Sequence, residues 1–131
     1  MAAIPYVKYE NVARALEWLS AAFGFTEERR YAHDDGAVFH AEMLTPQGDP
    51  VYLAGPGGDY RSPGATGHRS AMASIDVEDV EAVFARAGKA GATVAFPPTD
   101  TPQGLRVCKV EDHEGHEWFF SQRLKEAGDA A

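Results

Sequence analysis

The sequence predicts an α+β fold in which two tandem βαβββ modules form a cleft between curved mixed sheets. The first observation is an internal repeat, because residues 9–12 recur about 68 residues later as residues 77–80. The second is an amphipathic helical pattern after each copy, which ends at Gly24 in the first and at Gly91 in the second. The third is a turn glycine before a short apolar strand near the end of each copy. A duplicated module accounts for all three.

The first module is expected to begin with a strand, followed by a helix. Val12, Leu16 and Leu19 recur at helical spacing, and Asn11 is a residue type that favours a helix start. Three strands follow, and the turn Asp34-Asp35-Gly36 joins the first two as a hairpin. The expected elements are strand 3–9, helix 11–23 and strands 25–33, 37–45 and 50–54.

The second module repeats this order. Its helix is expected to start at Asp79, and its apolar residues recur at the spacing of the first helix. Pro97 to Gly104 favours a loop, and the Gly-, Pro- and Ser-rich residues 55–69 favour a linker. The expected elements are strand 70–77, helix 79–90 and strands 92–96, 105–111 and 116–121. The whole is expected to be one domain over 1–131, with module one at 3–54, the linker at 55–69, module two at 70–121 and a tail at 122–131.

Charge and composition limit the classes of function. Lys and Arg number 12 against 20 Asp and Glu, a net charge of −8, which argues against a nucleic-acid partner because phosphate contacts need a basic surface. The acidic balance either serves solubility or attracts a cationic small molecule. The sequence has no apolar run that would span a membrane and no signal-peptide pattern, and the single Cys108 excludes an internal disulfide. We expect a cytoplasmic protein with no membrane or nucleic-acid partner.

Three motifs carry a resemblance to a known family. They are Asn11 to Leu19 running into Ala22-Phe23-Gly24-Phe25, Ile75 to Val80 running to Ala90-Gly91-Ala92, and Val110 to Trp118. On these motifs the chain resembles, over roughly residues 4–121, the glyoxalase, bleomycin-resistance and extradiol-dioxygenase group, or vicinal-oxygen-chelate superfamily. His40-Ala41-Glu42 before a turn, and Arg106 after Pro102-Gln103-Gly104, resemble most the PhnB-like or glyoxalase-like branch. His113 stands where the family's Asp-Pro-x-Gly-His-x-Trp ending usually has proline. The resemblance implies a homodimer with a groove between its two chains.

Metal-dependent members of this family hold a divalent ion with one His, Gln or Glu from each of four strands. The repeat and the resemblance together place these positions at Ile4, Tyr52, Met72 and Phe119. Three of these side chains have no donor for a hard cation, and a tyrosine alone is a poor ligand. We therefore expect neither a metal site nor another cofactor. Without the ion, the family's isomerase, lyase and dioxygenase reactions lack their main electrostatic stabilisation.

One pair of polar side chains falls in the middle of a predicted strand. Alternation places His40 and Glu42 on the same face of it, whereas the other histidines are expected in turns or at the surface. The pair is either a hydrogen-bonded feature of a half-buried sheet or a group that orients a ligand or transfers a proton. Side chains of neighbouring strands either join it in a pocket or fill the cleft as core. The expected ligand-binding residues are Tyr6, Lys8, His40, Glu42, Tyr52, Met72, Ser74 and Phe119.

Three functions stay open on the sequence alone. The first is a metal-free binding protein for a small cationic or aromatic molecule, as in the antibiotic-resistance members of the family. The second is a metal-dependent lyase, isomerase or dioxygenase with a shifted ligand set such as His40 and Glu42. The third is a non-catalytic scaffold or regulatory module. The replaced metal positions favour binding over catalysis.

Overall fold

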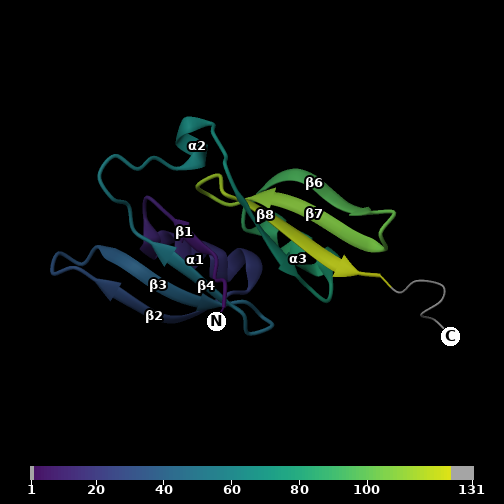
Figure 1. Cartoon of the computed structure of the whole chain (residues 1–131), viewed down its shortest axis with the longest axis horizontal. Coiled ribbons are helices and arrows are strands. Elements are labelled where there is room, and N and C mark those ends of the chain that lie inside the picture. The colour runs from purple at the N-terminus through teal and green to yellow at the C-terminus, as the bar shows by residue number, and fades with distance from the viewer. Residues whose placement is uncertain (1, 125–131) are drawn as a thin grey trace.

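The computed structural model describes residues 2–124 and contains two four-stranded mixed sheets, each with a helix packed against one face (Figure 1). The first module lies at the left of Figure 1 and the second at the right, while the linker and its short helix project above them. The predicted α+β class and the two βαβββ modules are confirmed. No helix in the described part of the chain is long and apolar enough to cross a membrane.

The first module has the strand order β1-β4-β3-β2, in which β1 runs parallel to β4 and the other neighbours are antiparallel. Its elements are β1 (Tyr6–Lys8), α1 (Val12–Phe23), β2 (Thr26–Ala32), β3 (Val38–Leu44) and β4 (Pro50–Ala54).

The second module has the matching order β5-β8-β7-β6, again with a parallel first pair. The pairing register repeats too, because Tyr6 lies opposite Tyr52 in the first sheet and Ser74 lies opposite Phe119 in the second. Its elements are β5 (Met72–Asp76), α3 (Val80–Lys89), β6 (Thr93–Asp100), β7 (Leu105–Glu111) and β8 (Glu117–Arg123), and the linker contains α2 (Pro63–Thr66).

Both long helices start at the residues that the sequence indicates. The Asn11 side chain accepts a hydrogen bond from the Arg14 amide at 3.0 Å, and Asp79 does the same for the Ala82 amide at 3.1 Å. These bonds satisfy amides that have no partner within the helix. Gly24 ends α1 with a φ of 74°, a left-handed conformation that costs glycine little.

The two helices pack on each other and join the modules into one hydrophobic core. The indole Nε1 of Trp18 on α1 donates to the Ala90 carbonyl at the end of α3, 3.0 Å away. From α3, the Arg86 guanidinium donates to the Ala21 carbonyl at 2.9 Å. The largest fully buried side chains of this core include Trp118 and Phe120 of β8.

The structure differs from the expected elements mainly in the second module. β6 continues to Asp100 through residues predicted to form a loop, including Pro97 and Pro98. β6 is an edge strand, where proline leaves no ladder hydrogen bond unmade, and an ion pair of 2.7 Å between Arg106 and Asp100 ties its end to β7. β8 runs two residues beyond 121, and β1 is shorter than strand 3–9. The rest of the expected tail, residues 125–131, lies outside the described part.

Candidate functional site

The face of the first sheet that points away from α1 carries the polar pair found in the sequence. Ala41 and Met43 of β3 are fully buried on the helix side, as alternation predicts. The His40 and Glu42 side chains point to the opposite side and keep 20% and 21% of their surface exposed. This second side, which we call the open face of the first sheet, is the candidate functional site.

Hydrogen bonds and an ion pair link side chains of β1, β3 and β2 across this open face. The hydroxyl of Tyr6 lies 2.6 Å from His40 Nδ1, and His40 Nε2 lies 2.9 Å from Glu42 Oε2. The other carboxylate oxygen, Oε1, lies 3.4 Å from Arg29 Nε. His40 and Glu42 are therefore a hydrogen-bonded pair, as one of the two sequence interpretations has it. The pair also continues into an exposed tyrosine, which a purely structural pair does not require.

Aromatic rings surround this chain of hydrogen bonds. Tyr6 meets His40 and Tyr52 edge to face, at centroid distances of 5.4 Å and 6.0 Å. His40 in turn lies 5.6 Å from Tyr52 and 5.7 Å from Tyr31. Tyr6 and Tyr31 remain 58% and 46% exposed. The four rings form one aromatic surface, which we call the four-ring face, with the Glu42 carboxylate at its side.

The second sheet has an open face of different chemistry. Phe119 meets Phe96 edge to face at 6.1 Å, and Ser74 lies opposite Phe119 in the register. Beside them, Lys109 Nζ and a Glu117 carboxylate oxygen are 3.1 Å apart. This face combines the two phenylalanine rings with a paired lysine and glutamate.

The structure thus distributes the eight expected ligand-binding residues over three places. Tyr6, His40, Glu42 and Tyr52 come together on the four-ring face. Ser74 and Phe119 lie on the open face of the second sheet. Lys8 and Met72 line a cavity between the modules, where Tyr6 also forms part of the wall.

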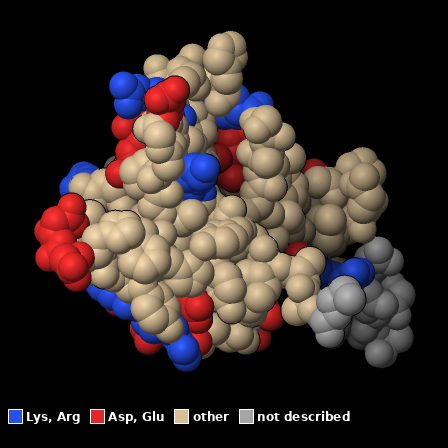
Figure 2. Space-filling model, turned by 60° about the vertical axis from the view of Figure 1, so that its left-hand side comes forward, with Lys and Arg blue, Asp and Glu red and all other residues tan. Residues whose placement is uncertain are grey.

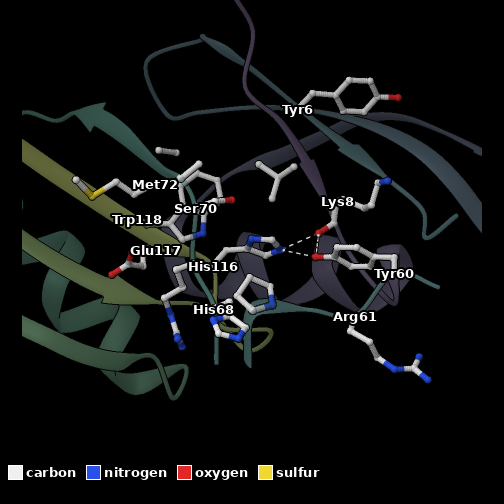
Figure 3. A pocket seen from close by; sticks show the side chains of 15 residues that line it. Tyr6, Lys8, Tyr60, Arg61, His68, Ser70, Met72, His116, Glu117 and Trp118 are labelled. Carbon is white, nitrogen blue, oxygen red and sulfur yellow. Dashed lines mark hydrogen bonds between the residues drawn. The ribbon is translucent and has the colours of Figure 1, made fainter. Parts of the chain in front are cut away.

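That cavity has a volume of about 390 Å³ and lies between β1, the linker and the paired strands β5 and β8. In Figure 3, His116 and Tyr60 converge on the backbone carbonyl of Lys8, which they approach to 2.7 Å and 2.8 Å, while Tyr6 lies apart from them. Figure 2 shows a hollow in the surface with acidic atoms deep inside it and basic atoms beside it. Sequence reasoning missed Tyr60 because it treated residues 55–69 only as a linker.

The structure corrects the expectation that two histidines near this cavity, His113 and His116, lie at the surface. His113 keeps only 11% of its side-chain surface exposed, and its ring stacks on Tyr9 at 5.8 Å and lies against Trp18. Neither ring nitrogen has a hydrogen-bond partner among the described residues, and burial lowers the pKa of His113. His116 lines the cavity. The turn around Gly115 contacts the first module, because Glu114 accepts the Asn11 amide at 3.1 Å and His116 lies 2.7 Å from the Lys8 carbonyl. These side chains therefore lie between the modules and do not extend into solvent as turn residues commonly do.

The side chains at the family's four metal positions do not fit a divalent ion. Tyr52 and Phe119 lie on the faces of two different sheets, Met72 is 55% exposed, and Ile4 precedes β1. None of the four brings a carboxylate or an imidazole. Among residues 2–124, no three His, Cys, Asp or Glu side chains are grouped so that they could hold a metal ion.

Paired βαβββ modules with open sheet faces define the class of protein, and comparison of sequences identifies the family. A model of the Glyoxalase/Bleomycin resistance protein/Dioxygenase superfamily matches residues 7–120, and the chain belongs to that superfamily. Over 127 residues it is 32% identical to an uncharacterized protein of Mycobacterium bovis, a match that covers 93% of this chain and 83% of the relative. An uncharacterized protein of Mycobacterium tuberculosis is also 32% identical, with 74% of its length covered.

Solved structures agree with this assignment. TioX from Micromonospora sp. ML1 is 34% identical, and the match has a TM-score of 0.75 and covers 93% of this chain and 95% of that one. A glyoxylase/bleomycin resistance protein/dioxygenase domain from Frankia sp. EAN1pec has a TM-score of 0.73 at 17% identity, with 94% and 97% covered. The second likeness shows the fold alone.

Proposed function

We propose that this protein binds a small aromatic molecule, with a cationic one favoured, on the four-ring face and without the metal ion that other family members use. The observation that carries the proposal is the group of Tyr6, Tyr31, His40 and Tyr52, whose rings contact one another on a sheet face that the protein's own core does not use. A flat ligand can stack on such rings, and each ring contributes contact area with little loss of side-chain entropy.

Charge supports a cation among aromatic ligands. Tyrosine rings present a negative π-surface, so a cation above them is attracted electrostatically. The Glu42 carboxylate lies beside the rings, and the chain as a whole carries a net charge of −8, which draws cations toward it over longer distances. Arg29 offsets part of the Glu42 charge, so the rings supply most of the expected affinity.

We also propose that the protein is a homodimer in which the open face of each first sheet lies across from the second sheet of the other chain. This arrangement covers large exposed side chains on both faces, such as Tyr6 and Met72 at 58% and 55% exposure. It also brings Phe119 and Ser74 of one chain toward the four-ring face of the other. Sedimentation equilibrium is expected to give twice the chain mass of 14.2 kDa, and a mass of one chain contradicts the dimer.

The binding proposal is tested with ethidium, a planar aromatic cation whose fluorescence reports binding. Titration of the protein is expected to saturate, and Tyr52→Leu is expected to weaken the affinity by about tenfold because one stacking ring is lost. Phe39→Leu is the matched control. Phe39 is an exposed aromatic residue of the same strand as His40, but its ring stacks on His33 at 4.4 Å and reaches the four-ring face only at Tyr31, 6.5 Å away.

Two other outcomes have a clear meaning. If Phe39→Leu weakens ethidium as much as Tyr52→Leu, the four-ring face is not the site. If the protein binds neither ethidium nor neutral aromatic probes, the scaffold interpretation replaces the binding one. The geometry does not favour a metal-dependent enzyme with a shifted ligand set such as His40 and Glu42, because these two side chains are hydrogen-bonded to each other at 2.9 Å.

A further inference from the structure

The four-ring face contains a chain of hydrogen bonds whose direction can be worked out from the chemistry of its members. The ionised Glu42 carboxylate only accepts hydrogen bonds, so the proton between it and His40 lies on Nε2. A neutral imidazole with a proton on Nε2 has an acceptor at Nδ1. The Tyr6 hydroxyl must therefore donate its hydrogen to Nδ1 across the 2.6 Å contact.

Every bond in this chain thus points toward the carboxylate. His40 donates to Glu42 Oε2 and Tyr6 donates to His40, while the Arg29 guanidinium forms an ion pair with Glu42 Oε1 at 3.4 Å. The hydroxyl hydrogen of Tyr6 is already used, while the lone pairs of its oxygen remain free. Because Tyr6 is 58% exposed, these lone pairs are available to a molecule above the sheet.

We propose that this polarity makes Tyr6 a specificity-determining residue, which presents a hydrogen-bond acceptor and selects ligands that carry an N–H or O–H donor over the four-ring face. The inference rests on the proposed function and adds to it the polarity of the ligand. Each member has its own part: Tyr6 contacts the ligand, His40 orients the Tyr6 hydroxyl, and Glu42 fixes the tautomer of His40. A ligand with only acceptors at this point would meet lone pairs instead of a donor, which is unfavourable in a partly desolvated site.

Two probes of equal charge measure this preference. Ethidium carries two aromatic amino groups, and its analogue without them has the same ring system and the same permanent positive charge but no N–H donor. The preference is the ratio of the analogue's dissociation constant to that of ethidium. Because both probes carry the same charge, the electrostatic attraction of the site affects both affinities alike and cancels in the ratio.

The wild-type protein is expected to prefer ethidium by about fivefold near pH 8, the effect of one neutral hydrogen bond. Tyr6→Phe is expected to bring the ratio close to that of stacking alone. Tyr52→Phe is the matched control, since it removes a neighbouring hydroxyl that is outside the chain and should change both affinities by the same factor. His40→Phe removes the acceptor of the Tyr6 hydroxyl, so the hydroxyl is free to turn its hydrogen toward the ligand and the preference for ethidium should fall.

The outcomes separate this inference from the function on which it rests. If neither probe binds, both are contradicted. If both probes bind and the ratio is the same in wild type and Tyr6→Phe, the acceptor role of Tyr6 is wrong and the aromatic site stands. If Tyr6→Phe lowers the ratio but His40→Phe does not, His40 does not set the direction of the hydroxyl. The preference of the wild-type protein itself is measured without any variant.

Discussion

Tyr9 of the first module donates its buried hydroxyl hydrogen to Asp112 Oδ2 of the second module, 2.6 Å away. The same carboxylate oxygen accepts the indole hydrogen of Trp118 at 3.0 Å. The other oxygen accepts the amides of Glu114 and His116, each at 3.0 Å. Asp112 is only 4% exposed, so one buried carboxylate holds the turn of the second module and joins it to the first. Burial and the nearby negative charge of Asp112 both raise the pKa of Tyr9.

Asp112→Asn is expected to lower the free energy of unfolding by about 2–4 kcal/mol, because the amide cannot accept all four hydrogen bonds and adds two donors of its own. Tyr9→Phe removes a single donor and should cost about 1–2 kcal/mol. Chemical denaturation of both variants measures the difference. An Asp112→Asn cost no greater than that of Tyr9→Phe would show that the carboxylate is not the centre of this network.

Acid is expected to destabilise the protein through His113. Burial lowers its pKa in the folded state, so the unfolded chain binds the proton more readily than the folded one. Stability should therefore fall as the pH drops below about 6.5, the ordinary pKa of histidine, and level off below the folded-state pKa. His113→Phe keeps an aromatic ring against Tyr9 and removes the titration, so its denaturation midpoint should depend less on pH over this range. An unchanged slope would assign the effect to another group.

Cys108 is expected to resist thiol reagents in the folded protein. It is fully buried, and burial with the nearby negative charge of Glu81 raises its pKa to about 11, so little thiolate forms near pH 8. It is the only cysteine of the sequence, so the reaction with a chromogenic disulfide reports on it alone. We expect slow labelling in buffer and rapid labelling in denaturant. Fast labelling of folded protein would contradict this burial.

Gly115 is a position where a side chain should not be tolerated. Its φ is 86°, and a Cβ placed there would lie 2.7 Å from the Cα of Gly64 in the linker helix. Gly115→Ala is expected to cost about 2–4 kcal/mol of stability, because it combines backbone strain with a clash against backbone. Gly36→Ala, with a φ of 88° and nothing within 4 Å of its Cβ, adds the strain alone and should cost about 1 kcal/mol. Equal costs would show that the linker yields at this contact.

Much of the fold could be predicted from local signals in the sequence. The apolar spacing and caps of the two helices specify their bounds to within a residue, because capping chemistry acts on the neighbouring amides. The extent of β6 could not be predicted from the sequence. Its prolines favour a loop, and a strand can contain them only at the edge of a sheet, which is a feature of the tertiary structure. Strand alternation likewise placed His40 and Glu42 on one face.

The burial of His113 and the distribution of the expected ligand-binding residues over three places could not be predicted from the sequence. His113 is buried because residues of both modules surround it, a contact between distant parts of the chain that spacing cannot reveal. The same holds for Tyr60, whose hydroxyl reaches the Lys8 carbonyl from the linker. The expected ligand-binding residues were assigned by strand alternation, which gives the face of a sheet but not how the two sheets face each other.

The most direct test of the proposed site is a map of amide chemical shifts in isotope-labelled protein as ethidium is added. We expect the largest changes at Tyr6, Tyr31, His40 and Tyr52 and their neighbours on β1 to β4, with smaller changes around Phe119 if the partner chain covers the face. Changes confined to Tyr60, His116 and the residues around the cavity, or no change at saturating ethidium, would contradict binding on the four-ring face.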